Sequence, residues 1–404
     1  MPQRRSMTPP RVLMLSLEYP PVFDGGLGIA VAALARALGR RGVAVDVVTR
    51  GAVAAVEHDE GVTVHRVPEP DGASIARDGY PGFLRWVDEL GERLEAAALA
   101  VAGERAVDVV HGHEWHAGGA AERVAERCGL PLVATIHATA RAKVQARGIR
   151  PRPRVEAAER SLAGAARVVT VASRWLAAEV AALGIPRERI AVVPLGVEVG
   201  PAPSAESVRR ARRALAEPGG RTILVAGRLV AEKGFQDAIA ALPALPETAL
   251  AVAGRGPLAP ALRDAAASAG VADRVRFLGR LEHKALPAHY AAADLVAMPS
   301  RYEPFGLVAL EAMAAGRPLV AAEVGGLAEI LPAGEAAMRF PAGDVDALTA
   351  RAGALLDDAD LRRRVTEAGR RRAERFTWHD VAARFAELYA EVLAASGNAV
   401  AAAR

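Results

Sequence analysis

Cysteine, aromatic side chains and long apolar runs are all scarce in this sequence of 404 residues. The single cysteine, Cys128, excludes an intrachain disulfide, and we therefore expect a cytoplasmic location. No apolar run reaches the ~18 residues that a membrane-spanning helix needs, and the opening segment does not have the pattern of a signal peptide. Aromatic residues make up only 4% of a chain that is 51% hydrophobic, so its cores must consist mainly of Ala, Val and Leu.

Charge is spread over the chain, with a formal net charge of +4. Arginines gather at 209–213, 362–364 and 370–372, as is usual for solvated helix faces. No aromatic residues alternate with them, which argues against a nucleic-acid partner. Peripheral contact with an anionic membrane surface stays open, and so does the choice between a monomer and a homodimer.

The chain reads as two successive series of alternating strands and helices, which predicts an α/β protein with two domains. We expect residues 1–10 to be a disordered tail, 11–199 and 200–375 to form the two domains, and 376–396 to be a final helix. The boundary lies in the Pro-, Ala- and Ser-rich run 200–207.

A glycine loop, Gly25-Gly-Leu-Gly28, lies between the expected strand 11–17 and a helix ending near Arg40, before the strand 43–48. This order brings backbone close to a ligand at the carboxyl edge of a parallel sheet. A dehydrogenase would need G-x-G-x-x-G and an acid after the second strand. Thr49 and Arg50 stand there instead, so a nicotinamide cofactor is disfavoured.

The central stretch of the sequence is 299–311, Pro-Ser-Arg-Tyr-Glu-Pro-Phe-Gly-Leu-Val-Ala-Leu-Glu. A helix beginning at Pro304 would leave the N–H groups of residues 305–307 free to bind phosphate oxygens. Glu303 and Glu311 flank this site, and carboxylates there suit sugar hydroxyls rather than phosphate. The pattern predicts a ligand with phosphate and polyol groups.

Two basic side chains precede this stretch in the sequence. Two other segments resemble metal-binding motifs, but a different explanation fits each of them better. Arg228 and Lys233 lie on either side of a turn and can converge on one diphosphate, so no metal is needed. The Asp344-Val-Asp346 segment begins a helix, and a helix cap explains it better than a metal site. The histidines within 111–116 do not have a zinc spacing and fit a substrate pocket.

Glu303 and Glu311 resemble the E-x7-E motif of the family 4 retaining glycosyltransferases. The resemblance implies the GT-B fold, in which two Rossmann-like doubly wound domains face each other across a cleft. Residues 11–199 would then be the acceptor-side domain and 200–375 the nucleotide-sugar domain, and the helix at 376–396 would cross back to the first domain. It implies that Glu303 contacts the donor sugar and Glu311 the ribose. The segment between them, Pro304, Phe305, Gly306 and Leu307, would hold the diphosphate.

Five further segments resemble the family and extend over nearly the whole chain. They assign Gly26, Gly28 and Arg280 to the donor, Arg228 and Lys233 to the donor and to catalysis, and His137 to catalysis, where Glu303 of the E-x7-E motif joins them. His137 would face the transferring sugar. Family members commonly have a Glu and a Gly-Arg pair soon after this histidine, where this chain has Ala140, Arg141 and Lys143.

Acceptor contacts are assigned from expected loops at the cleft. The loop 71–82 contributes Tyr80, and the segment after the strand 107–110 contributes His113 and Trp115. Thr139 and Arg141 follow His137. Residues 147–154 are expected to be a basic loop.

The function that the resemblance implies is retaining transfer of a hexosyl unit from a UDP-, ADP- or GDP-hexose to a hydroxyl group. The acceptor would be a glucan, an oligosaccharide or a small molecule, in carbohydrate or natural-product biosynthesis. No cofactor is expected, because the nucleotide sugar is a substrate. A nucleotide-sugar epimerase of the same fold and a non-catalytic nucleotide-sugar binder stay open as alternatives.

Overall fold

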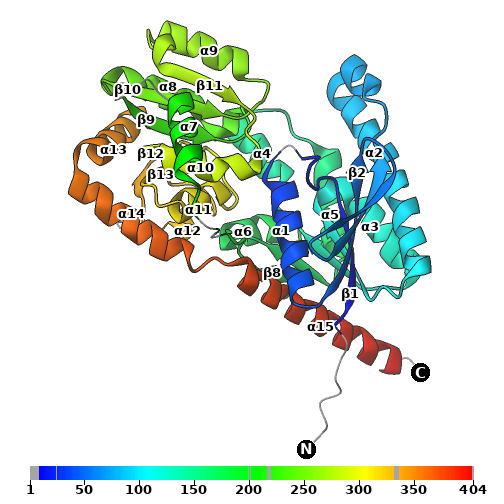
Figure 1. The fold of residues 1–404 in the computed structure, drawn as a ribbon. Helices are drawn as coiled ribbons and strands as arrows, with labels where there is room; N and C mark the ends of the chain where they lie inside the picture. The colour runs from blue at the N-terminus through cyan, green and yellow to red at the C-terminus, as the bar shows by residue number, and fades with distance from the viewer. Residues whose placement is uncertain are drawn as a thin grey trace, which may run out of the picture.

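The computed structural model describes residues 9–402 except Asp24, Val199, Pro201, 216–219 and 332–335, so most of the expected tail lies outside the described residues. Two α/β domains lie side by side, with α14 (Ala359–Ala373) and α15 (Trp378–Ala402) along their lower side in Figure 1. The described residues form one sheet of eight strands, ordered β3-β4-β2-β1-β5-β6-β7-β8, and one of six, ordered β11-β10-β9-β12-β13-β14. Both sheets are parallel apart from the antiparallel edge pair β3–β4.

The strands of the first sheet are β1 (Arg11–Ser16), β2 (Ala44–Gly51), β3 (Ala55–Asp59), β4 (Val62–Pro68), β5 (Val109–His113), β6 (Leu132–Thr135), β7 (Val168–Val171) and β8 (Ile190–Val192). Its helices are α1 (Gly26–Arg40), α2 (Ala73–Glu104), α3 (Glu114–Cys128), α4 (Ala140–Arg147), α5 (Pro153–Ala165) and α6 (Arg174–Ala181). The strands of the second sheet are β9 (Arg221–Ala226), β10 (Thr248–Ala253), β11 (Val275–Gly279), β12 (Leu295–Met298), β13 (Leu319–Ala322) and β14 (Met338–Phe340). Its helices are α7 (Ala205–Leu215), α8 (Phe235–Ala241), α9 (Ala259–Ser268), α10 (Leu286–Ala292), α11 (Leu307–Ala314), α12 (Leu327–Ile330), α13 (Val345–Asp357) and α14.

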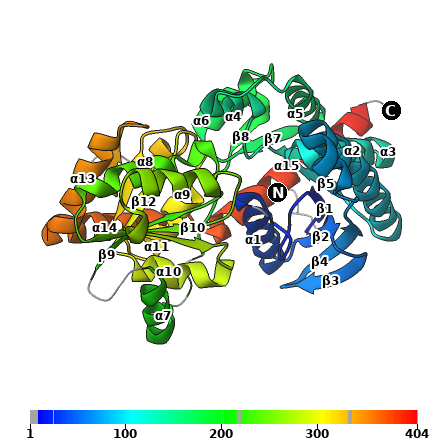
Figure 2. The ribbon, with the colours of Figure 1, turned by 90° about the horizontal axis from the view of Figure 1, so that it is seen from above.

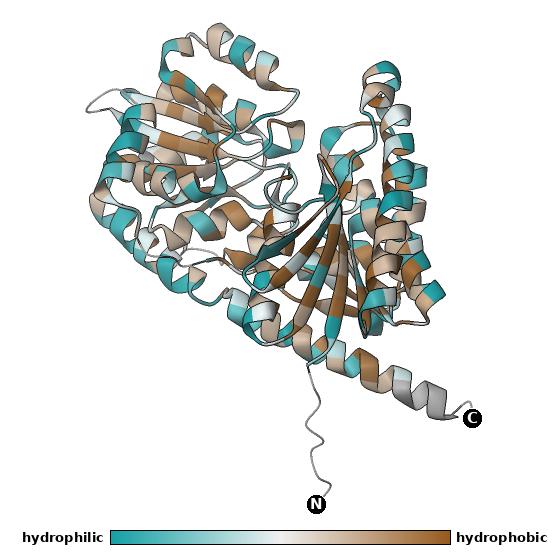
Figure 3. Ribbon diagram, turned by 45° about the vertical axis from the view of Figure 1, so that its right-hand side comes forward, coloured by the Kyte–Doolittle hydropathy of each residue, from teal (hydrophilic) through white to brown (hydrophobic). Residues whose placement is uncertain are grey.

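Each sheet is covered on both faces, which is why its central strands read as continuous apolar runs. In β1, Val12 and Met14 pack with α1 and α15, while Leu13 and Leu15 face the opposite core with α2 and α3. Figure 3 shows the brown strands inside and the teal positions on the outer helix surfaces. The expected α/β fold with two doubly wound domains is confirmed.

The two segments that connect the domains lie side by side. Val197 donates its N–H to the carbonyl of Phe376 at 2.8 Å, and it also forms an isolated parallel bridge with Thr377. A Cβ on Gly196 would lie 2.5 Å from the backbone nitrogen of Trp378, so only glycine fits at this crossing. Beyond it, α15 packs on α1 and extends to Ala402, past the expected end at 396. Among the described helices, none is both long and apolar enough to cross a membrane.

The expected helix start at Pro304 is wrong, because α11 begins at Leu307. Two tertiary contacts hold the preceding turn outside the helix. The hydroxyl of Ser173 donates to the carbonyl of Pro304 at 2.8 Å, and the Gly326 N–H donates to that of Glu303 at 3.0 Å. The favourable φ of proline at a first helical position is therefore outweighed by packing across the domain junction.

The expected cleft loop at 71–82 is also wrong, because most of this segment is helical. Gly79 has φ 58°, which kinks α2, and Pro81 follows as one of the first residues of the second helical part. A missing N–H has little cost at that position, so Gly79 and Pro81 lie where one helical segment ends and the next begins.

The basic run 147–154 contains less loop than expected. Arg147 is the last residue of α4, and α5 begins at Pro153.

The edge strand β3 was not predicted, since its largely exposed residues give no apolar alternation. The expected helix cap is confirmed, because the Asp344 carboxylate accepts from the Ala347 N–H at 2.8 Å.

Candidate active site

The glycine loop at the start of α1 contacts the second domain. A Cβ on Gly25 would lie 3.8 Å from Cδ of Arg228, and one on Gly26 would lie 3.4 Å from Cδ1 of Leu307. Gly28 is placed differently, since its N–H donates to the Glu18 carboxylate at 3.2 Å and its Cα packs against Phe23. Gly26 thus faces the opposite domain, while Gly28 holds the loop in shape.

Free backbone donors lie directly opposite Gly26. In the part of the chain that the structure describes, the N–H groups of Phe305, Gly306, Leu307 and Val308 have no protein acceptor. Gly306 has φ 118°, and a Cβ there would lie 2.8 Å from Cδ1 of Leu327, so a side chain would be both strained and crowded. These donors at the N-terminal end of α11 can hold an anion even though the helix begins later than expected.

Two cations lie beside these amides. Lys233 ends the short 3-10 helix η2 (Ala231–Lys233), and its Nζ donates to Oε2 of Glu303 at 2.6 Å. Arg228 follows β9, and its Nη2 lies 3.8 Å from Oε1 of Glu232. Arg228, Lys233 and Glu303 therefore all lie at the carboxyl end of the second sheet.

A cavity of about 1020 Å³ lies between the domains and reaches the N-terminal end of α11, where Leu307 lines it. Its wall includes Glu311, which accepts from the Tyr290 hydroxyl at 2.7 Å. Burial raises the pKa of Glu311, and the hydrogen bond from Tyr290 opposes that rise. Across the cavity, the Arg280 guanidinium lies 4.4 Å from the centre of the Phe23 ring. The cavity has the size and mixed lining of a small-molecule site, with residues from both domains.

His137 lies in the first domain, just after β6. Its N–H and that of Ala138 both donate to Oε1 of Glu114, at 2.6 and 2.8 Å. Burial lowers the pKa of His137 to about 4, and the positive charge of Lys143 adds to this, so the ring is neutral at pH 7. Burial also raises the pKa of Glu114, whose φ of 63° is unusual for a non-glycine residue. Glu114 fixes the backbone that carries His137.

The five expected acceptor residues make three different sets of contacts. Tyr80 and Trp115 each lie beside Phe83, with ring centroids 6.4 and 6.3 Å away. Thr139 and Arg141 both contact Glu179, at 3.5 and 3.2 Å. His113 is buried, and its Nδ1 lies 3.4 Å from Nε2 of His137.

Of the three histidines near β5, His111 is engaged in internal hydrogen bonds, whereas Nε2 of His113 and Nδ1 of His116 are buried without a hydrogen-bond partner among the described residues. His111 contacts the Tyr389 hydroxyl at 2.8 Å and the Thr135 hydroxyl at 2.7 Å. The described residues contain no group of three or more His, Cys, Asp or Glu side chains arranged to hold a metal ion.

Sequence reasoning missed Glu114 and Tyr290 as parts of the site, together with the ion pair between Arg147 and Glu232. Glu114 had one usable signal, an acid directly after a buried strand, where the carboxyl ends of parallel strands meet. Arg147 and Glu232 are 85 positions apart, and their pairing across the cleft has no local signature.

Two family models match the chain, the Glycosyl transferase 4-like domain over residues 25–196 and Glycosyl transferases group 1 over residues 208–372. A glycogen synthase from Mycobacterium tuberculosis is 36% identical, and the match covers 94% of each chain. A D-inositol 3-phosphate glycosyltransferase from Xylanimonas cellulosilytica is 35% identical, with 95% of this chain and 97% of the relative covered.

Solved structures share the fold at lower identity. The sucrose-phosphate synthase from Thermosynechococcus elongatus superposes with a TM-score of 0.84 and 24% identity, over 96% of this chain and 100% of that one. Anabaena HepE, solved in complex with UDP and glucose, gives a TM-score of 0.75 at 20% identity, over 94% and 99%.

Proposed function

This chain belongs to the family 4 type of GT-B glycosyltransferases, and we propose that it transfers a hexosyl unit from a nucleoside-diphosphate sugar to a hydroxyl group. We further propose that the anomeric configuration is retained and that no metal takes part. The observation that carries the proposal is that Arg228, Lys233 and the free amides of residues 305–308 lie at the carboxyl end of the second sheet, next to a cavity between the domains that Leu307 and Glu311 line.

The two cations and the amides fit a diphosphate leaving group. Arg228 can bind two oxygens in parallel, while Lys233 acts as a point charge. Preorganised donors of this kind stabilise charge that develops in the transition state, commonly by several kcal/mol. Because they supply positive charge themselves, a metal ion has no necessary role.

The two acids of the E-x7-E segment fit the sugar ends of the donor. Glu303 lies beside Lys233 and can accept from hydroxyls of the transferring sugar. Glu311 lies in the cavity wall with Tyr290 and can accept from the ribose hydroxyls. Arg280 and Phe23 lie further along the same cavity, where the base would fit.

Retention needs either a covalent intermediate or attack by the acceptor from the side of the leaving group. Glu303 is paired with Lys233, while Glu114 and Glu159 accept backbone N–H groups, so these carboxylates are already engaged. We therefore favour same-face attack. The acceptor oxygen bonds to the anomeric carbon as the bond to the diphosphate breaks, and the acceptor proton passes to a diphosphate oxygen. His137 would contact the transferring sugar.

The acceptor side is proposed more broadly. The relatives named above have different acceptors, and the expected acceptor residues make three different sets of contacts. A sugar or a small polyhydroxylated molecule fits the family. The cytoplasmic location, the peripheral membrane contact and the oligomeric state stay predictions.

Calorimetric titration with UDP, ADP and GDP tests the donor site, and mass spectrometry of products with candidate acceptors tests the transfer. We expect one diphosphate to bind at micromolar to millimolar concentration, and Lys233→Ala and Glu311→Ala each to abolish transfer while the melting temperature stays near that of the wild type. Wild-type activity in both variants would exclude the proposed site. Epimerised donor without any acceptor would identify an epimerase, and binding without turnover a nucleotide-sugar binder.

A further inference from the structure

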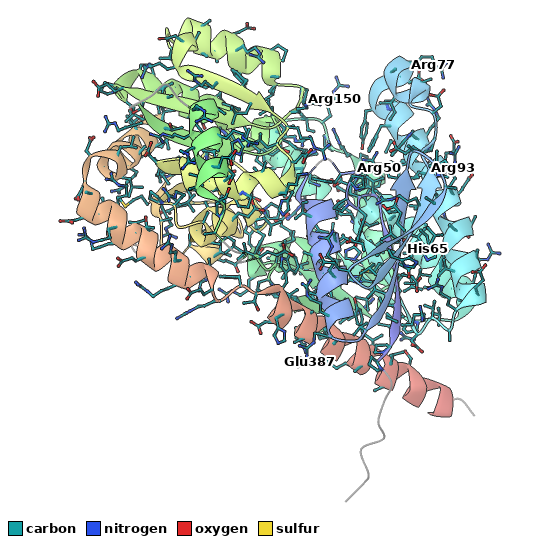
Figure 4. The ribbon with its side chains drawn as sticks, viewed as in Figure 1. Arg50, His65, Arg77, Arg93, Arg150 and Glu387 are labelled. Carbon is teal, nitrogen blue, oxygen red and sulfur yellow. The ribbon has the colours of Figure 1, made fainter. Side chains whose placement is uncertain are left out.

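An ion pair joins the two domains directly beside the donor cations. Arg147 at the end of α4 reaches Glu232 of η2, with its Nε donating to Oε2 at 2.7 Å and its Nη2 donating to Oε1. The Arg147 side chain is 21% exposed and that of Glu232 only 4%. Figure 2 shows α4 and α6 at the junction between the domains, and in Figure 4 the labelled Arg150, three residues further on, lies between the second domain and the tip of α2.

Glu232 also lies close to a proposed diphosphate ligand. Its Oε1 is 3.8 Å from Nη2 of Arg228, a separation that a rotation of either side chain could close. The backbone of Glu232 cannot easily move away, because its carbonyl accepts from the N–H groups of Arg301 and Tyr302 at 2.8 and 3.3 Å. A buried carboxylate in this place must pair with some cation, because an unpaired buried charge is costly.

Arg147 and Arg228 are thus two available partners for one buried carboxylate. Arg147 comes from the first domain and can reach Glu232 only when the cleft is closed. Arg228 belongs to the same domain as Glu232, four positions before it, and is available whether the cleft is open or closed.

We propose that Arg147 is a positioning residue that binds the Glu232 carboxylate when the cleft closes and thereby frees the Arg228 guanidinium for the donor diphosphate. Without Arg147, Glu232 pairs with Arg228 and neutralises it. Cleft closure and the charge of the donor site are then coupled through one carboxylate. This inference rests on the proposed function, in which Arg228 binds the diphosphate.

The test compares Arg147→Met, Glu232→Gln and the double variant by calorimetry. The probes are inorganic pyrophosphate and whichever of UDP, ADP and GDP binds the wild type. We expect Arg147→Met to weaken binding about 10-fold or more, the value of one charge-assisted contact. Glu232→Gln should bind at least as well as the wild type. The double variant should recover to within about 3-fold of the wild type, since the competing charge is gone.

A purely structural ion pair predicts the opposite pattern, in which all three variants weaken binding alike, and that result would overturn the inference. So would a double variant as weak as Arg147→Met, which would show that Arg147 itself binds the ligand. Arg154→Met is the matched control, because Arg154 is an exposed arginine of the same basic run that pairs with Asp88 within the first domain. It should leave both affinities unchanged.

Two further results separate the inference from its premise. Failure of the wild type to bind pyrophosphate and all three nucleotides would overturn the proposed donor site as well. If Arg147→Met does not fold, Arg147→Lys replaces it, with a smaller loss in the same direction. Addition of Glu232→Gln should again restore binding, and no restoration in that background would refute the inference.

Discussion

The first domain buries His111, His113 and Glu114 near the cleft, whereas the second leaves Arg228 and Lys233 partly exposed to it, at 47% and 22%. In both domains, polar groups lie at the carboxyl ends of parallel strands. In the first domain, burial opposes the charged forms, because it lowers the pKa of His111 and His113 and raises the pKa of Glu114. In the second, the charges are retained and paired with acids.

This difference suggests a division of work between the domains. In the proposed function, a nucleoside diphosphate would carry its charge to the second domain, where cations and free amides can replace its water. The sugar and the acceptor hydroxyl are neutral, and the first domain would offer them a neutral imidazole and fixed backbone. Substitutions in the two domains should therefore affect different steps.

The largest expected effect separates binding from turnover. His137→Ala removes a neutral group that we propose contacts the transferring sugar, and we expect kcat to fall by about 10²–10³ with the nucleoside diphosphate Kd nearly unchanged. Lys233→Ala should instead weaken nucleotide binding itself. Steady-state kinetics and calorimetry on the same preparations give both quantities.

The proposed division of work between the domains depends on this difference between His137→Ala and Lys233→Ala. If His137→Ala weakens nucleotide binding as much as Lys233→Ala does, the two domains do not divide the work in this way. Thermal melting of both variants provides the control, since loss of the fold would change every quantity together.

A second prediction concerns the stability of the first domain in acid. Burial lowers the pKa of His111 to about 3, and the nearby His137 adds to this. Between pH 6.5 and 4 the unfolded chain therefore binds a proton at this position that the folded chain does not. The free energy of unfolding must fall as pH drops through that window, by on the order of 2–3 kcal/mol for this one histidine at pH 4.

Buried carboxyls act in the opposite direction. Burial raises the pKa of Glu159 to about 8, and the neighbouring charge of Glu114 adds to the rise, so its contribution to stability is lost as pH rises toward 8. One substitution isolates the contribution of His111 to the pH dependence of the free energy of unfolding. His111→Gln should reduce the loss of stability between pH 7 and 4, measured by denaturant unfolding, whatever its effect at pH 7. His58→Gln changes an exposed histidine of β3 and should leave the slope as it is.

The sequence predicts the fold class and much of the proposed donor site because both depend on local patterns. Continuous apolar runs separated by glycine loops predict parallel strands, and strand ends predict where Arg228, Lys233 and Glu303 meet. What the sequence does not show is the outcome of contacts between distant segments. Packing against Ser173 and Gly326 moves the start of α11 from Pro304 to Leu307.

The acceptor side shows the same limit more strongly. Gly79 and Pro81 predict a loop at Tyr80, but the structure has helical segments on both sides of a kink at Gly79. The ion pair between Arg147 and Glu232 has no sequence signature at all, because each residue alone is typical of a solvated surface. Interactions between the domains are therefore the least predictable part of the molecule.

The smallest expected effect tests another contact across the domain junction. Glu329 at α12 accepts the N–H groups of Arg174 and Trp175 at the start of α6, at 3.0 and 2.6 Å. Glu329→Ala should remove an N-terminal helix contact worth about 0.5–2 kcal/mol. Because the two partners belong to different domains, the closed arrangement should lose that stability, and the radius of gyration from small-angle X-ray scattering should increase slightly.

A cap within one domain is the matched control for this prediction. Asp344 accepts the Ala347 N–H at the start of α13, so Asp344→Ala should lower the melting temperature by a similar few degrees without any change in the radius of gyration. Identical scattering from both variants would show that Glu329 contributes only local helix stability. In that case cleft closure would depend on the other contacts across the junction, among them the ion pair between Arg147 and Glu232.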